Sequence, residues 1–239
     1  KSTIQAIKSL KKKNINIAIA TGRSLAMVKQ ESFYDLFKTI ISANGSLITV
    51  NDEVIYKEYM NQRLVRDLLT VFEKNQTPYC IHFLHESKGK LNQAWVAEFS
   101  IKYNMPLGYL EEDILNQIEK YEVFQINAYI KDSEIEMMRQ SYPQFSFVKL
   151  IDIEDGYDIF NKHCSKGSAI RYLRSHQSGK EMEYYAFGDG FNDLEMFAEV
   201  DYSIAMGNGC DLLKERATYV TDSIHENGIY NALKNLKLI

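Results

Sequence analysis

The chain has 239 residues, 45% hydrophobic and 25% charged, which is the composition of an ordinary globular protein with one large or two smaller domains. Its formal net charge of -4 provides no broad basic surface, which argues against nucleic acid as a partner. Apolar runs stay well below the roughly 18 to 20 residues of a membrane span, and no signal segment opens the sequence, so we expect a cytoplasmic protein with no membrane partner.

The first 58 residues alternate between helical and extended patterns. Ile4, Ile7 and Leu10 share one face of a predicted helix, and a largely apolar run follows it. A polar turn comes next, and Ser24 is placed to cap a second helix. We predict a helix over 2–13, a strand over 15–20, a helix over 24–37, a strand over 40–42, and hairpin strands over 47–50 and 54–56.

Residues 59–158 follow a different pattern, typical of an α+β insertion. All three prolines lie within it, and its strands alternate between apolar and polar residues, as in a sheet that is open on one face. The predicted elements are a helix over 62–74, extended segments over 79–84 and 93–99, a helix over 111–120, a strand over 124–130, a helix over 133–140 and a strand over 146–150.

After residue 158 the first pattern returns, with helices over 166–175 and 192–198 and strands over 183–187 and 202–205, then a helix, a strand and a terminal helix. Alternating units of this kind build a parallel sheet with helices on both faces. We therefore predict an α/β protein with a discontinuous Rossmann-like core at 1–58 and 159–239, interrupted by a cap domain at 59–158.

The strongest chemical signal is the loop Gly188 to Asp193, which lies between a predicted strand of continuous apolar residues and an amphipathic helix. Ligands bind at this end of the strands in open α/β sheets. A dinucleotide fingerprint would need a small residue where Asp193 stands, and an EF-hand loop would need an oxygen ligand where Phe191 stands. Asp189 and Asp193 instead fit a Mg²⁺ site, although Asp, Gly and Asn also form ordinary turns.

Two further loops fall at the same predicted edge. Thr21 and Gly22 follow the first strand and offer a hydroxyl and free N–H groups, although such a turn is also an ordinary helix cap. Lys166 opens the helix after the cap domain, where a cation opposes the helix dipole, so a nearby anion would explain its position. By itself, a lysine at this position is more often a solvated surface lysine.

Together these loops resemble the second, third and fourth motifs of the haloacid dehalogenase-like phosphatases, in their Cof-type branch. The matching segments are Thr21-Gly22-Arg23-Ser24, Ser42-Ala43-Asn44-Gly45, Lys166-Gly167, Gly188-Asp189-Gly190-Phe191-Asn192-Asp193, Ala205-Met206-Gly207-Asn208 and Glu226-Asn227-Gly228-Ile229.

The resemblance implies phosphoryl transfer through an aspartyl-phosphate intermediate, with Mg²⁺ as cofactor. It places Thr21, Gly22, Asn44, Lys166 and Asn192 at the phosphate. Asp189 and Asp193 would serve the metal, Asp193 through water or by fixing the loop. The catalytic set implied in this way is Thr21, Lys166, Asp189 and Asp193.

The cap would close over the site and select the substrate. His82, Trp95 and Tyr157 could contact a ligand there, but aromatic residues in a cap more often belong to its core.

The chain departs from the family in one respect. Family members place an Asp-x-Asp pair after a first strand, ahead of the helix that corresponds to 2–13 here. We therefore expect this sequence to be part of a longer enzyme whose central strand and nucleophile lie upstream of Lys1, and the chain by itself to be inactive.

The expected substrates are small phosphorylated metabolites, sugar phosphates first and phosphorylated cofactors such as pyridoxal phosphate or flavin mononucleotide next. Two alternatives stay open: a phosphomutase or phosphotransferase of the same superfamily, and an inactive module that only binds phosphate.

Overall fold

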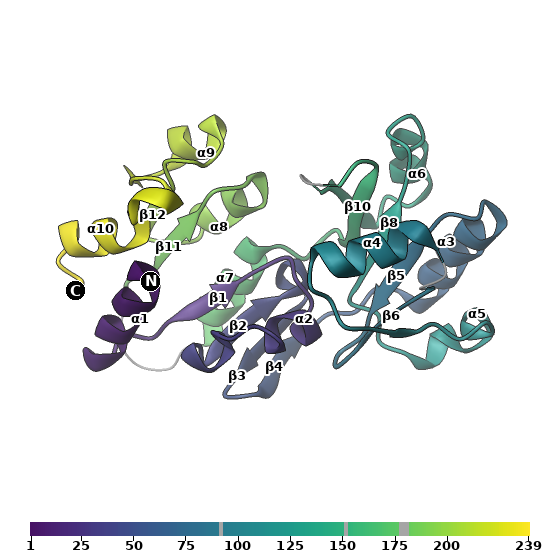
Figure 1. The fold of residues 1–239 in the computed structure, drawn as a ribbon, viewed down its shortest axis with the longest axis horizontal. Helices are drawn as coiled ribbons and strands as arrows, with labels where there is room; N and C mark the ends of the chain where they lie inside the picture. The colour runs from purple at the N-terminus through teal and green to yellow at the C-terminus, as the bar shows by residue number, and fades with distance from the viewer. Residues whose placement is uncertain (91–92, 151–152, 177–181) are drawn as a thin grey trace.

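The computed structural model describes residues 1–90, 93–150, 153–176 and 182–239, and Figure 1 shows their arrangement. The N-terminal core segment begins with a helix whose Ala6, Ile7 and Leu10 are buried, as its apolar spacing predicts. The elements of this segment are α1 (Ser2–Lys12), β1 (Ala18–Ala20), α2 (Leu25–Lys29), β2 (Thr39–Ser42), β3 (Leu47–Val50) and β4 (Glu53–Lys57).

The C-terminal core segment alternates helices and strands to its end, and its last helix packs against α1 (Figure 1). Its elements are α7 (Lys166–His176), β11 (Tyr185–Gly188), α8 (Leu194–Phe197), β12 (Tyr202–Ala205), α9 (Asp211–Arg216), β13 (Tyr219–Val220) and α10 (Gly228–Asn235).

The core strands form two sheets. The first has the order β1-β2-β3-β4, with β1 and β2 parallel, and the second has the order β11-β12-β13, with all neighbours parallel. Apolar clusters join the sheets, since Ala20 of β1 packs in the same cluster as Ala186 of β11. Within the described residues, β1 pairs only with β2 and β11 only with β12, so each strand has one unpaired edge.

The inserted segment forms a six-stranded sheet with the order β7-β6-β5-β8-β10-β9. Its apolar face packs against helices around buried Leu68, Phe72 and Ile126. The elements are α3 (Gln62–Lys74), β5 (Tyr79–His82), β6 (Ser87–Gly89), α4 (Ala94–Lys102), β7 (Leu107–Tyr109), α5 (Ile114–Gln117), β8 (Gln125–Tyr129), α6 (Ile135–Ser141), β9 (Phe145–Lys149) and β10 (Gly156–Asn161).

The predicted α/β class, with a parallel-sheet core and an inserted α+β segment, is confirmed. One predicted element is wrong: the extended segment over 93–99 is part of helix α4. Val96 and Phe99, the buried residues of α4, are three positions apart, and a short apolar run does not distinguish helix from strand. The predicted helix over 24–37 is also too long, because α2 ends at Lys29 and a separate 3-10 turn covers Tyr34–Leu36.

The boundary placed at residue 158 falls inside β10, which pairs along its length with cap strands β8 and β9. No helix in the described part of the chain has the length and apolar character needed to cross a membrane.

Candidate active site

Three polar loops follow the carboxyl ends of β1, β2 and β11. They contain Thr21, Asn44 and Asp189 respectively. In open α/β sheets this edge is where ligands bind, because backbone N–H groups and polar side chains meet there without a strand to cover them.

The loop after β1 is tied to β2 and to its own helix. The Thr21 N–H donates to the Ile41 carbonyl at 2.9 Å, and the Thr21 hydroxyl accepts the Arg23 N–H at 3.1 Å. Ser24 caps α2 by accepting the Met27 N–H at 3.4 Å. The ordinary cap expected for this turn is therefore present, and it holds Thr21 and Gly22 at the edge of the sheet.

The loop after β2 lies directly against the first one. The Asn44 N–H donates to the Thr21 carbonyl at 3.1 Å, and the Ala43 N–H donates to the Arg23 carbonyl at 2.8 Å. A Cβ added to Gly22 would lie 2.9 Å from Asn44 Oδ1, so the amide side chain fills the space that a larger residue would take. Asn44 is 4% exposed and has a left-handed backbone, with φ of 52°.

Lys166, in the first turn of α7, meets the acidic loop. Its Nζ donates to Asp193 Oδ1 at 2.6 Å, and both side chains are at most 9% exposed. The other carboxylate oxygen of Asp193 accepts the N–H groups of Asp189 and Gly190, at 2.9 and 3.0 Å. Asp193 is thus the anion that the lysine position led us to expect, and it cross-links α7 to the loop after β11.

The Asp189 carboxylate is exposed, and no hydrogen bond or ion pair to it occurs among the described residues. A free carboxylate at this edge fits one protein ligand of Mg²⁺, which commonly takes its remaining ligands from water and phosphate. The described ranges contain no group of three His, Cys, Asp or Glu side chains that could hold a metal by themselves. Asn192 is likewise exposed, beside Gly190.

A continuous series of contacts therefore joins Thr21, Gly22 and Asn44 in one half of the core, and Lys166, Asp193 and Asp189 in the other. The two halves meet where Gly45 packs against Ser165: a Cβ on Gly45 would lie 2.1 Å from the Ser165 carbonyl oxygen. The roles that the resemblance assigns to these residues stay predictions.

The three cap residues considered as ligand contacts are all engaged within the protein. His82 is 1% exposed and hydrogen-bonded on both ring nitrogens. Trp95 stacks on Phe99, and the Tyr157 hydroxyl donates to Asp132 at 2.5 Å.

Sequence analysis missed the buried polar residues that the cap directs toward the core. Asp158 of β10 accepts hydrogen bonds from Asn127 of the cap and from Asn44 of the core. The available signal was the polar pair Gln125 and Asn127 at alternate positions of an otherwise apolar strand.

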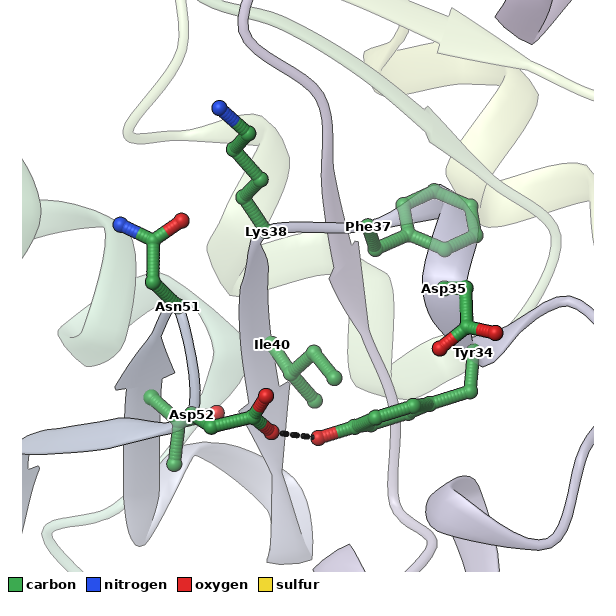
Figure 2. Close-up of a pocket in the computed structure, with 8 residues that line it drawn as sticks. Tyr34, Asp35, Phe37, Lys38, Ile40, Asn51 and Asp52 are labelled. Carbon is green, nitrogen blue, oxygen red and sulfur yellow. Dashed lines mark hydrogen bonds between the residues drawn. The ribbon is translucent and has the colours of Figure 1, made fainter.

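A separate cavity of about 240 Å³ opens at the other end of β2, around a Tyr34 hydroxyl that donates to Asp52 (Figure 2). It lies beside Lys38, just before β2 begins, whereas the three loops follow the strand ends. It is not part of the candidate site.

The family model described as haloacid dehalogenase-like hydrolase matches residues 1–233. The Bacillus subtilis protein named "Putative phosphatase YkrA" is 31% identical, over all of this chain and 91% of its own length. A hypothetical protein of Geobacillus kaustophilus has a similar structure, with a TM-score of 0.88, 28% identity, and coverage of 100% of this chain and 91% of that one. So does the subclass IIB sugar phosphatase BT4131, with a TM-score of 0.83, 27% identity, and coverage of 100% and 92%.

Proposed function

The chain belongs to the haloacid dehalogenase-like hydrolases, and on that premise we propose that the intact protein hydrolyses phosphate monoesters of small metabolites, with sugar phosphates as the first class. The observation that carries the proposal is the buried Lys166–Asp193 pair, which holds an ammonium group against the loop that contains Asp189. The names of two similar proteins add support, since one is "Putative phosphatase YkrA" and the other is the sugar phosphatase BT4131.

The arrangement suits a transferring phosphoryl group, whose negative charge is stabilised by fixed donors and cations. In the proposed reaction, the Thr21 hydroxyl and the N–H groups around Gly22 bind phosphate oxygens, and Lys166 offsets their charge. Asn44 and Asn192 are proposed as further phosphate contacts. Asp193 holds Lys166 and the backbone before Asp189 in place.

The proposed nucleophile is an aspartate that precedes Lys1. Its carboxylate oxygen forms a bond to phosphorus while the bond from phosphorus to the ester oxygen breaks, and the ester oxygen takes a proton from solvent as it leaves as the alcohol. Water then attacks phosphorus and gives up a proton to solvent, the bond from phosphorus to the aspartate oxygen breaks, and phosphate and the free carboxylate result. The unpaired edges of β1 and β11 support this proposal, because a strand between them would end beside Thr21 and Asp189.

Asp189 is the residue proposed to hold Mg²⁺, and a bound Mg²⁺ would supply further charge stabilisation for the phosphoryl oxygens. The exposed carboxylate of Asp189 fits this role better than that of Asp193, since Asp193 already accepts three hydrogen bonds.

Substrate choice is proposed to reside in the cap, which would cover the leaving group and exclude water. A cytoplasmic location and the absence of nucleic-acid and membrane partners stay predictions from composition and charge.

Acceptor competition tests hydrolysis against phosphoryl transfer to a second substrate. With a sugar phosphate and the full-length protein, we expect inorganic phosphate to appear at the same rate with or without an added free sugar. A fall in phosphate release, matched by a new phosphorylated sugar, would identify a phosphotransferase or phosphomutase. Phosphate binding without any turnover would identify a binding module.

A further inference from the structure

A series of buried polar side chains connects the cap sheet to the two core loops that follow β1 and β2. The sheet register places Asn127 of β8 opposite Asp158 of β10 on one side and opposite Cys80 of β5 on the other. Their neighbours Ile126 and Ile159 point to the apolar face of the cap. We call the series the polar bridge, and its members are Ser24, Asn44, His82, Ser87, Asn127 and Asp158.

One end of the polar bridge is a carboxylate that is 9% exposed. Asp158 Oδ2 accepts the Asn44 side-chain amide of the core at 3.4 Å, and Oδ1 accepts the Asn127 side-chain amide of the cap. Both carboxylate oxygens are therefore engaged by side chains of the protein, one from each domain.

The other end returns to the core. Asn127 Oδ1 contacts His82 Nε2, and His82 Nδ1 contacts the Ser87 hydroxyl at 2.8 Å. The Ser87 hydroxyl lies 3.4 Å from that of Ser24, which also accepts the Met27 N–H as the cap of α2. The bridge thus begins and ends at the two loops that follow β1 and β2.

The donors of the polar bridge all point toward Asp158. The Asn127 amide donates to the carboxylate, so its oxygen accepts from His82 Nε2–H, and His82 Nδ1 then accepts from Ser87. This requires a neutral imidazole, and burial lowers the pKa of His82 to about 4. Each donor in this series has an acceptor when Asp158 is ionised, because an ionised carboxylate accepts hydrogen bonds and donates none.

Asn44 connects Asp158 to the Thr21 loop. Its side chain fills the space above Gly22, where a Cβ would come within 2.9 Å, and its N–H donates to the Thr21 carbonyl. The left-handed backbone of Asn44 leaves few alternative conformations in which both contacts survive.

We propose that Asp158 is a positioning residue: as a carboxylate it holds the Asn44 side chain against Gly22, and it thereby fixes the Thr21 loop when the cap lies on the core. The expected effect on turnover rests on the proposed function, whereas the expected effect on the order of the Thr21 loop does not. Contact between Asp158 and the leaving group is the competing role, and it would require breaking the hydrogen bonds described above.

Protonation of Asp158 would disturb the bridge, because a carboxylic O–H would face the amide donors of Asn44 and Asn127. Burial raises the pKa of Asp158 to about 6, against the lowering effect of hydrogen bonds from Asn44, Gln125 and Asn127. Among the described residues, two titratable groups of β5 lie near Asp158: Cys80, whose thiol pKa is raised by burial and by the Asp158 charge, and His82, which is connected to Asp158 through Asn127. Neither is charged near pH 6.

Activity and stability should consequently respond to pH in opposite directions. Activity should fall as pH drops through about 6, because Asn44 loses its ionised partner. Because the pKa of Asp158 is raised in the folded protein, its carboxylate binds a proton more tightly there than in the unfolded chain. The stability that Asp158 contributes is therefore fully present below its ordinary pKa of 3.8 and is lost as pH rises through about 6.

Hydrogen exchange on the full-length protein tests the structural step without any assay of activity. In Asp158→Asn we expect the amides of Ala43 and Asn44, which donate to the Thr21 loop, to exchange at least about tenfold faster. Asp113→Asn, at an exposed cap carboxylate, is the matched control and should leave them unchanged. Asn127→Ala, which removes the donor to Oδ1, should also accelerate exchange. Unchanged exchange in both bridge variants would overturn the proposal.

Steady-state kinetics test the consequence for the reaction. Asp158→Asn should lower kcat/KM by about 10- to 100-fold, by the same factor for different phosphate esters, and should lose the acidic limb near pH 6. A loss that differs between leaving groups, or an unchanged acidic limb, would overturn the positioning role. If the wild-type enzyme releases no phosphate, the proposed function fails, whereas the exchange experiment still decides the role of Asp158.

Discussion

Gly45 shows how one residue controls the contact between the two halves of the core. Its φ is +94°, and a Cβ there would lie 2.1 Å from the Ser165 carbonyl oxygen, one residue before Lys166. Any side chain would therefore meet both an unfavourable backbone conformation and a steric clash with main-chain atoms, which cannot rotate away.

We expect Gly45→Ala to lower the free energy of unfolding by about 2 to 4 kcal/mol, measured by urea denaturation. Gly108→Ala is the matched control, because a Cβ at Gly108 would make only ordinary contacts at 3.5 Å or more. Equal urea midpoints for the two variants would show that Gly45 does not limit the approach of α7.

Lys166 illustrates what a single residue reveals before a structure is known. A cation in the first turn of a helix opposes the dipole, which predicted an anionic neighbour, and Asp193 occupies that place. Asp158 could not be found in the same way. Its partners come from β8 and from the loop after β2, and their proximity depends on strand register, which local sequence does not specify.

Among the elements, the existence of the core strands was predictable, because continuous apolar runs followed by polar turns repeat along both core segments. Their lengths were less predictable: the run over 15–20 forms only the three residues of β1. Despite its apolar sequence, β1 is only partly buried, with Ala18 exposed and Ile19 and Ala20 half-buried. In the part of the chain that the structure describes, β1 pairs along one edge only, and this exposure lies on that strand.

The strand that we propose to precede Lys1 would pair with β1 and β11 and bury these residues. We expect the full-length protein to unfold at a higher urea concentration than residues 1–239, and the amides of β1 and β11 to exchange more slowly. A Gly/Ser segment of equal length is the control and should change neither. Equal midpoints for all three proteins would contradict the central-strand account.

At the scale of the whole molecule, the change of sequence pattern at about residue 59 predicted an inserted segment, and the last strand of its sheet, β10, runs past the boundary placed at residue 158. Sequence could not give the way the two domains meet. That contact depends on polar groups that pair across the interface, such as Asn44 with Asp158.

The most direct test of the account is Mg²⁺-dependent release of inorganic phosphate from an aryl phosphate by the full-length protein and its Asp189→Asn variant. We predict turnover by the wild type that chelation of Mg²⁺ stops, and a loss of at least about 100-fold in the variant. Asp211→Asn, at a carboxylate that is 97% exposed in its side chain, should keep the wild-type rate. A near-normal rate for Asp189→Asn would contradict the proposed metal site and the mechanism built on it.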